Sequence, residues 1–262
     1  MKQFFFKATA AFAILSSAVF AQQSAQTLTG TFVFSEEGTG GTQPIASIAL
    51  LTFTNGGMVS GTELTHSPGS TLQSSLQGSF TLNNDGTGAV SLLATTMPTD
   101  GSDPVSFMVN YQLIAQKSGT ITALRTDNGF FTIGHLSKAA PAGLPKGAFA
   151  FAEHGNGAAF AGLGIVTLDG ANALTGTERV EALGSSLVSA LTGSYAIGAN
   201  GFGTMAIMSP ATDVFGNITS TPMNYAFVVG ADQIFAIRTD NNAAALATLS
   251  SLDAPTTVAA NQ

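Results

Sequence analysis

The chain repeats one residue pattern twice, and this duplication constrains its fold more than any other feature. The segment Gly30–Gly38 (GTFVFSEEG) matches Gly147–Gly155 (GAFAFAEHG), and Arg125–Asn128 (RTDN) matches Arg238–Asn241. Between these anchors, shorter matches follow in the same order with only small insertions. They pair Gly61–Glu63 with Gly176–Glu178, Leu76–Phe80 with Leu191–Tyr195, Gly86–Gly88 with Gly201–Gly203, and Asn110-Tyr111 with Asn224-Tyr225. The sequence therefore predicts two copies of one structural unit.

Both copies show the alternation that is typical of β-strands. Leu72–Leu82 alternates large residues with small or polar ones, and Leu187–Ile197 does so in the same register. Pairs such as Asp85-Gly86 and Asn200-Gly201 accept positive φ and close hairpins, and no helical periodicity follows residue 21. We expect strands near 30–36, 45–54, 58–65, 71–82, 87–95, 104–115, 119–127 and 130–137, and near 147–153, 159–168, 172–182, 186–197, 202–209, 221–229, 232–239 and 243–250.

The short turns between consecutive strands favour antiparallel meanders, and eight such strands close into a small barrel without exposed edges. The predicted fold class is all-β, with two tandem antiparallel eight-stranded up-and-down barrels; a pair of sandwiches is the alternative. The expected division of the chain is a signal peptide (1–21), a polar leader (22–27), β repeat 1 (28–138), a Pro-rich linker (139–146), β repeat 2 (147–253) and a flexible tail (254–262).

The first residues predict export. Lys2 and Lys7 form a basic start, Ala8–Ala18 is a short apolar run, and Val19–Ala21 ends in small residues suited to cleavage. The apolar run is shorter than the roughly 20 residues that a membrane-spanning helix needs, and no later run is long enough. We therefore expect an extracellular, periplasmic or cell-surface protein without a transmembrane helix.

Composition removes several classes of function. The chain has no Cys, which excludes disulfide scaffolds, thiol catalysis and Cys-ligated metals. Eight basic residues stand against fifteen acidic ones, so no nucleic-acid partner is expected. The sequence carries no motif for a cofactor or a metal ion.

The recurring charges are the candidate site residues. Arg125 and Arg238 each end a predicted strand on a partly apolar face. A desolvated arginine needs a carboxylate partner. The candidates are Glu63 or Asp127 for Arg125, and Glu178 or Asp240 for Arg238. We interpret these as structural ion pairs that close the barrels, and an anion-binding arginine is the alternative.

One strand of each repeat is apolar on both faces. Ile48 and Leu50 lie on the second face in repeat 1, and Leu163 and Ile165 are their equivalents in repeat 2. A free barrel shows water a polar outer face, so we predict that the two repeats pack against each other through these residues. The surface of a homo-oligomer and a hydrophobic ligand groove are the alternatives.

No catalytic motif recurs. His66, His135 and His154 have no counterparts in the other repeat, and the adjacent Glu36 and Glu37 point to opposite faces of one strand. The predicted function is a secreted, non-enzymatic barrel with a structural, surface-adhesive or small-apolar-ligand binding role. The alternatives are a sixteen-stranded, porin-like outer-membrane barrel and a hydrolase or isomerase at a barrel mouth.

The Gly-x-Phe-x-Phe openings Gly30–Phe34 and Gly147–Phe151 occur together with Asn/Asp-Gly-x-Gly hairpins and a late apolar strand. In this combination the chain resembles a loose class of uncharacterised secreted bacterial tandem-repeat proteins over most of residues 28–252. The resemblance implies export and a β-barrel-like fold, and no activity. Leu174–Glu178 with Leu191–Tyr195 is also similar to a hairpin of avidin-like barrels, whose ligand sites are lined by Trp; this chain has none.

Overall fold

The computed structural model describes most of both repeats. The described residues are 28–98, 102–116, 119–141, 143–156, 160–182, 185–212, 218–240 and 244–252. The predicted signal peptide, polar leader and tail lie outside these residues. Within the described ranges, the chain contains no helix with the length and hydropathy needed to cross a bilayer.

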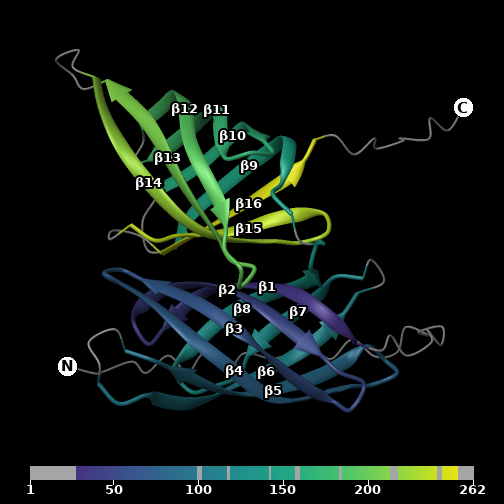
Figure 1. The fold of residues 1–262 in the computed structure, drawn as a ribbon. Helices are drawn as coiled ribbons and strands as arrows, with labels where there is room; N and C mark the ends of the chain where they lie inside the picture. Colours follow the sequence, from purple (N-terminus) through teal and green to yellow (C-terminus); the bar gives the residue numbers. More distant parts are fainter. Residues whose placement is uncertain are drawn as a thin grey trace, which may run out of the picture.

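The strands form two closed antiparallel barrels of eight strands each (Figure 1). Barrel 1 consists of β1 (Gly30–Gly40), β2 (Gln43–Phe53), β3 (Met58–Ser67), β4 (Ser70–Leu82), β5 (Thr87–Thr96), β6 (Val105–Ala115), β7 (Ile121–Arg125) and β8 (Phe130–Lys138). Barrel 2 consists of β9 (Lys146–Asn156), β10 (Phe160–Asp169), β11 (Ala173–Ala182), β12 (Ser185–Ile197), β13 (Gly203–Thr212), β14 (Ile218–Val229), β15 (Gln233–Arg238) and β16 (Ala244–Ser251).

The closing strand pairs decide between the predicted architectures. β8 pairs with β1, and β16 pairs with β9, so each repeat closes its own sheet. The prediction of two tandem eight-stranded barrels is confirmed. The sandwich alternative and the single sixteen-stranded barrel are wrong, because neither sheet has an open edge that could pair with the other.

Local sequence explains the hairpins and their register. Gly86 and Gly201 occupy equivalent turns with φ of +85° and +82°, a region that glycine enters without steric cost. Both turns follow Asn or Asp, as expected for tight hairpins. Because these turns set the strand pairing, the period-two alternation places one set of side chains inside the barrel along every strand.

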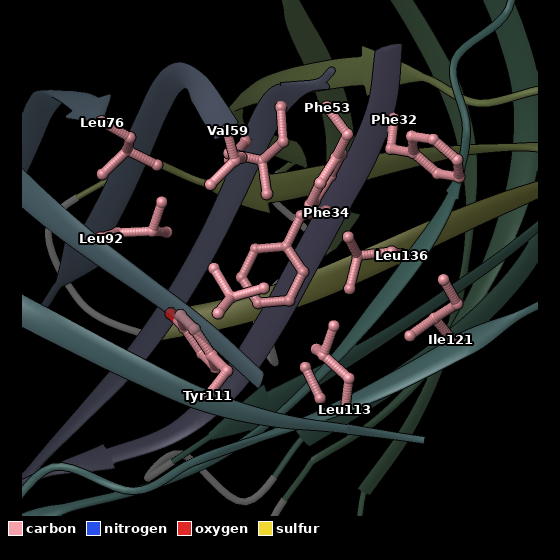
Figure 2. Packing of buried hydrophobic residues seen from close by; sticks show 14 of the residues in the cluster. Phe32, Phe34, Phe53, Val59, Leu76, Leu92, Tyr111, Leu113, Ile121 and Leu136 are labelled. Atoms are coloured by element: carbon pink, nitrogen blue, oxygen red, sulfur yellow. The ribbon is translucent and has the colours of Figure 1, made fainter. Parts of the chain in front are cut away.

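The interior of barrel 1 is packed with apolar side chains over most of its length. Figure 2 shows Phe34 and Tyr111 next to each other within this core, and their ring centroids are 5.3 Å apart at near right angles. Phe53 packs edge-on against both Phe32 and Phe80. Barrel 2 has a matching core built around Phe151, Tyr225 and Phe227. The repeated aromatic positions therefore serve as core residues.

A third apolar cluster joins the two barrels, which stack with β1 and β2 facing β14–β16 (Figure 1). Ile48 is completely buried in this cluster and Leu50 packs against it. Barrel 2 contributes Phe202, Ala226, Val228, Phe235, Ile237, Ala244 and Leu246. Backbone bonds add to the contact, since Ala140 N donates to Val229 O at 2.9 Å and Ala231 N to Lys138 O at 2.8 Å.

The prediction for repeat 2 needs correction at this interface. Leu163 and Ile165 are 67% and 51% exposed on the outer face of β10, and they do not belong to the cluster between the barrels. The two barrels do not meet through equivalent strands: β2 of the first lies on β14, β15 and β16 of the second. The expectation assumed that a duplicated sequence would use the same face twice. A head-to-tail contact instead joins two different faces.

Candidate functional site

Each barrel has one apolar end and one polar end. In barrel 1 the inward positions near the end of β1, within β3 and β6, and at the end of β7 carry Glu36, Glu63, Tyr111 and Arg125. Glu36 follows Phe34 by two residues, so it shares the inward face that the aromatic core defines. Antiparallel pairing brings these four positions together, and all four side chains are buried.

The polar end of barrel 1 is a connected network. Tyr111 Oη donates a hydrogen bond to Glu36 Oε2 at 3.1 Å, and Thr132 Oγ1 donates to the same oxygen at 2.8 Å. Arg125 Nη1 lies 3.5 Å from Glu36 Oε1, and Arg125 Nε donates to Asp127 Oδ2 at 2.8 Å. The guanidinium also lies 3.6 Å from the centroid of the Phe130 ring. Arg125 therefore closes this end of barrel 1 through its contacts with Glu36, Asp127 and Phe130.

Burial decides the protonation of the two glutamates. Loss of solvation raises the pKa of Glu36, although Arg125 opposes the rise. Burial and the nearby Glu36 charge raise the pKa of Glu63 to about 8. Burial likewise raises the pKa of Tyr111 well above its usual value. Burial therefore favours the protonated forms of Glu63 and Tyr111 at neutral pH, and the Tyr111 hydroxyl donates its hydrogen bond to Glu36.

Barrel 2 repeats this arrangement of Glu, Tyr, Arg and Asp side chains, which we call the charged frame. Tyr225 Oη donates to Glu153 Oε2 at 2.9 Å, and Arg238 Nη1 lies 3.8 Å from Glu153 Oε1. Arg238 also donates two hydrogen bonds to Asp240, from Nε at 2.7 Å and from Nη2 at 2.9 Å. Burial raises the pKa of Glu153 to about 7 and raises that of Glu178 as well. The charged groups thus keep the same relative positions in both barrels.

The neutral hydroxyl groups around this frame differ between the barrels. In barrel 1, Ser47 stands opposite Glu36 in the register of β1 and β2, and it hydrogen-bonds to Thr65 at 2.9 Å. Thr65 in turn hydrogen-bonds to Glu63, which favours the charged form. Thr132 donates to Glu36. All three hydroxyls therefore support the buried carboxyl groups.

Barrel 2 has lost these three hydroxyls. Gly162 stands opposite Glu153, and Val180 stands opposite Gly162, at the positions of Ser47 and Thr65. Ala245 stands opposite Gly155, where barrel 1 has Thr132 opposite Gly38. A small or apolar residue thus replaces each hydroxyl that supports a carboxyl group in barrel 1.

The loss leaves buried polar atoms without partners. Among the described residues, neither carboxylate oxygen of Glu178 has a hydrogen-bond partner, although the residue is only 2% exposed. Ser189 Oγ is also unpartnered within the described ranges, whereas its counterpart Ser74 bonds to Thr96 at 2.6 Å. The Arg238 side chain is 20% exposed, against 6% for Arg125. The polar end of barrel 2 is therefore more open and less satisfied.

The predicted site residues divide into two groups. Arg125 lies beside Asp127, and Arg238 beside Asp240, two residues further along the chain in each case. Glu63 and Glu178 lie in the same clusters, but neither forms an ion pair with its arginine in the part of the chain that the structure describes. The carboxylates that face the arginines are instead Glu36 and Glu153.

Glu36 and Glu153 are not among the site residues that the sequence predicts. The adjacent Glu36 and Glu37 point to opposite faces of β1, as expected, and Glu37 points outward, where it pairs with His154 of barrel 2. The signal that could have found both is their spacing, because each glutamate stands two residues after an inward phenylalanine in a repeated segment.

The histidines lie outside the two barrel interiors. His66 is buried between the barrels, with Nδ1 2.8 Å from Thr71 Oγ1, and burial lowers its pKa although Asp240 opposes this. His135 and His154 are exposed on outer faces of β8 and β9. In the described ranges, no group of three or more His, Asp or Glu side chains is arranged to hold a metal ion.

Two spaces in the molecule have defined linings. An open hollow of about 500 Å³ follows the hairpin of β7 and β8, where Arg125, Phe130 and Thr132 line it together with Leu124 and Ile133. At the apolar end of barrel 2, a gap of about 180 Å³ leaves no room for a water molecule. Its lining residues are Leu168, Tyr195, Met205, Phe227, Ile234 and Leu249. That end of barrel 2 is filled by its own side chains.

Comparison with known proteins identifies no family. No protein-family model matches the chain, and no curated protein matches it. One solved structure that aligns with it is kievitone hydratase from Nectria haematococca, at 12% sequence identity and a TM-score of 0.28. The alignment covers 94% of this chain and 96% of that one. A likeness at this level carries no argument about activity.

Proposed function

We propose that this protein is an exported, non-catalytic binding protein whose second barrel accepts a small polar ligand at its polar end. Barrel 1 is its structural counterpart, in which the chain's own hydroxyl groups bond to the equivalent carboxyl groups. The observation that carries the proposal is the buried carboxyl group of Glu178, which has no partner among the described residues.

The physical argument rests on the cost of unsatisfied polar groups. A buried donor or acceptor without a partner costs about 1–3 kcal/mol, and more when it is charged. In barrel 1, hydroxyl groups bond to both equivalent glutamates. Of the buried carboxyl oxygens that the structure describes in these two residues, Glu36 Oε1 alone lacks a hydrogen bond, and it lies 3.5 Å from Arg125 Nη1. A ligand that bonds to Glu178 and Ser189 would replace what barrel 2 lacks. Barrel 1 therefore serves as the internal control, against which the unpartnered carboxyl group of barrel 2 is compared.

Two further parts of the proposal rest on sequence and on placement. Export is supported by Met1–Ala21, which has the organisation of a cleaved signal peptide. A non-catalytic role is supported by the position of the histidines, all of which lie outside the two barrel interiors. It is also supported by the occurrence of the Glu–Tyr–Arg frame in both barrels, since a frame that closes barrel 1 serves a structural purpose there.

The test is native mass spectrometry of the full chain, purified without detergent from the exported fraction of its own host. We expect wild-type protein to carry a bound small molecule. The variant Gly162→Ser/Ala245→Thr restores two barrel 1 residues and should lose it. The matched variant Ser47→Gly/Thr132→Ala changes only barrel 1 and should keep it. A ligand retained by the restored variant, or an apo wild type that takes up no ligand when supplied, would contradict the proposal.

A further inference from the structure

We infer that the ligand of barrel 2 is a small organic cation, with a primary ammonium group that binds between Glu178 and Glu153. This inference rests on the proposed binding function and names the chemical class of its ligand. It is argued from the charge balance of the site, from the lost hydroxyls and from the missing side chain at Gly162, which brings Glu178 toward Glu153.

The charge balance of the cluster favours a cation. Three carboxyl groups, those of Glu153, Glu178 and Asp240, surround the single guanidinium of Arg238. That guanidinium is already engaged by Asp240 through two hydrogen bonds of 2.7 and 2.9 Å, and it lies 3.8 Å from Glu153. Arg238 is close enough to oppose the rise in the pKa of Glu178, but the carboxyl group of Glu178 accepts no hydrogen bond from it in the described part of the chain. An anionic ligand would find the only nearby guanidinium already neutralised.

The hydroxyl groups that barrel 2 lacks indicate whether its ligand donates or accepts hydrogen bonds. In barrel 1, Thr132 donates to Glu36, and Thr65 hydrogen-bonds to Glu63. The ligand that replaces these hydroxyls must therefore supply donors. An ammonium group has three donors and no acceptor. The unpartnered atoms of the site are Glu178 Oε1, Glu178 Oε2, Glu153 Oε1 and Ser189 Oγ, and each can accept a hydrogen bond.

Gly162 determines where the carboxyl group of Glu178 lies. A Cβ atom at Gly162 would collide with Glu178 Oε1, and it would also stand 3.8 Å from Glu153 Cβ. The missing side chain therefore lets Glu178 reach across β10 toward Glu153. In barrel 1, Ser47 occupies the corresponding position. The two glutamates of barrel 2 thus come together because position 162 has no side chain.

The wall around the two carboxyl groups suits the carbon chain of an organic cation. The Phe160 ring lies 5.7 Å from the Arg238 guanidinium, and Met223 Sδ accepts a contact from Tyr225 Oη at 3.7 Å. Met223 is buried in the core of barrel 2 next to the polar end. An alkyl ammonium can therefore place its charged head on the glutamates and its carbon chain along apolar surface.

Three probes with the same four-carbon body separate the possible ligand classes: n-butylamine, 1-butanol and butyrate. We expect calorimetry at pH 8 to show n-butylamine binding at least tenfold more tightly than the other two, a difference of about 1.4 kcal/mol. An alkylamine is charged at this pH, as lysine is. Binding should release protons, because a bound cation favours the ionised forms of Glu178 and Glu153, which face each other and Arg238, Asp240 and Tyr225.

Matched variants locate the effect. Glu178→Gln should weaken n-butylamine binding at least tenfold and reduce proton release, whereas Glu63→Gln, the same change in barrel 1, should leave both unchanged. Restoring Ser, Thr and Thr at positions 162, 180 and 245 should also abolish binding. Because a Cβ atom at position 162 must displace the flexible end of Glu178, circular dichroism checks that the restored variant folds. The variant Val180→Thr/Ala245→Thr leaves Gly162 unchanged and should also weaken n-butylamine binding.

The outcomes distinguish this inference from the proposed function. Equal or tighter binding of 1-butanol or butyrate, lost in the restored variant, would overturn the ammonium and keep the binding site. Amine binding that survives Glu178→Gln would overturn the assignment to these glutamates. If no probe binds and native mass spectrometry also finds no ligand, both the inference and the proposed function are refuted.

Discussion

The buried glutamate of barrel 1 makes the stability of the protein depend on pH in an unusual direction. Glu63 lies in the barrel interior, where burial and the charge of Glu36 raise its pKa from 4.5 to about 8. Between these two pH values the folded chain keeps a proton that the unfolded chain releases. The free energy of unfolding must then fall as pH rises. This contribution is complete below about pH 4.5 and is lost as pH rises through about 8.

The size of the effect follows from the two pKa values. One pKa unit corresponds to about 1.36 kcal/mol, so the rise to about 8 removes up to about 5 kcal/mol of unfolding free energy between pH 4.5 and pH 8. Glu63→Gln replaces the carboxyl group with a neutral amide of similar shape. The variant should therefore lose this part of the pH dependence while keeping the contribution of Glu36.

The assay is urea unfolding of wild type and Glu63→Gln at pH 4.5, 6.5 and 8, followed by far-ultraviolet circular dichroism. Hydrogen exchange of peptides from β1–β8 reports barrel 1 separately. Glu153→Gln tests a second buried glutamate, in barrel 2, where the pKa of about 7 predicts a smaller loss of about 3 kcal/mol. A wild-type stability that rises from pH 4.5 to 8, or a Glu63→Gln variant with the wild-type pH slope, would refute the reasoning.

Two pairs of substitutions test the arginines and the barrel interface. Arg125→Met leaves Glu36 and Asp127 without their buried partner and should lower the unfolding free energy by about 3 kcal/mol at pH 8. Arg238→Met changes a more exposed side chain and should lower it by about half as much. Equal losses for the two variants in urea unfolding would contradict this prediction. Ile48→Ala should cost about 3 kcal/mol because Ile48 is fully buried between the barrels, whereas Leu163→Ala should change stability by less than about 0.5 kcal/mol. A larger loss of stability for Leu163→Ala than for Ile48→Ala would contradict the interface between β2 and β14–β16.

Most of the fold follows from short-range sequence signals. The alternation in Leu72–Leu82 and Leu187–Ile197 predicts β4 and β12, and the observed strands Ser70–Leu82 and Ser185–Ile197 extend only a few residues further. Asp85-Gly86 and Asn200-Gly201 predict the hairpins that follow them. These signals work because strand periodicity and turn geometry are properties of neighbouring residues.

The candidate site was only partly predictable. Asp127 lies two residues after Arg125, just beyond the end of β7, so local geometry brings the two side chains together, and Arg238 and Asp240 repeat the arrangement at the end of β15. Glu36 is far from Arg125 in the sequence and reaches it only because β1 and β7 meet through the barrel interior. No local pattern indicates that contact, since it depends on the closure of the sheet.

The sequence by itself determined that this chain forms two copies of an eight-stranded unit, because duplication, alternation and turn residues all act over short distances. Tertiary structure decided which outer faces meet, and it chose β2 against β14–β16 instead of two equivalent strands. It also decided that Glu178 is buried without a hydrogen-bond partner among the described residues while Glu63 bonds to Thr65. This difference coincides with changes at three positions on three strands: Gly162 on β10, Val180 on β11 and Ala245 on β16. Both outcomes depend on contacts between distant segments, whose free energies are set only when the barrels close and pack.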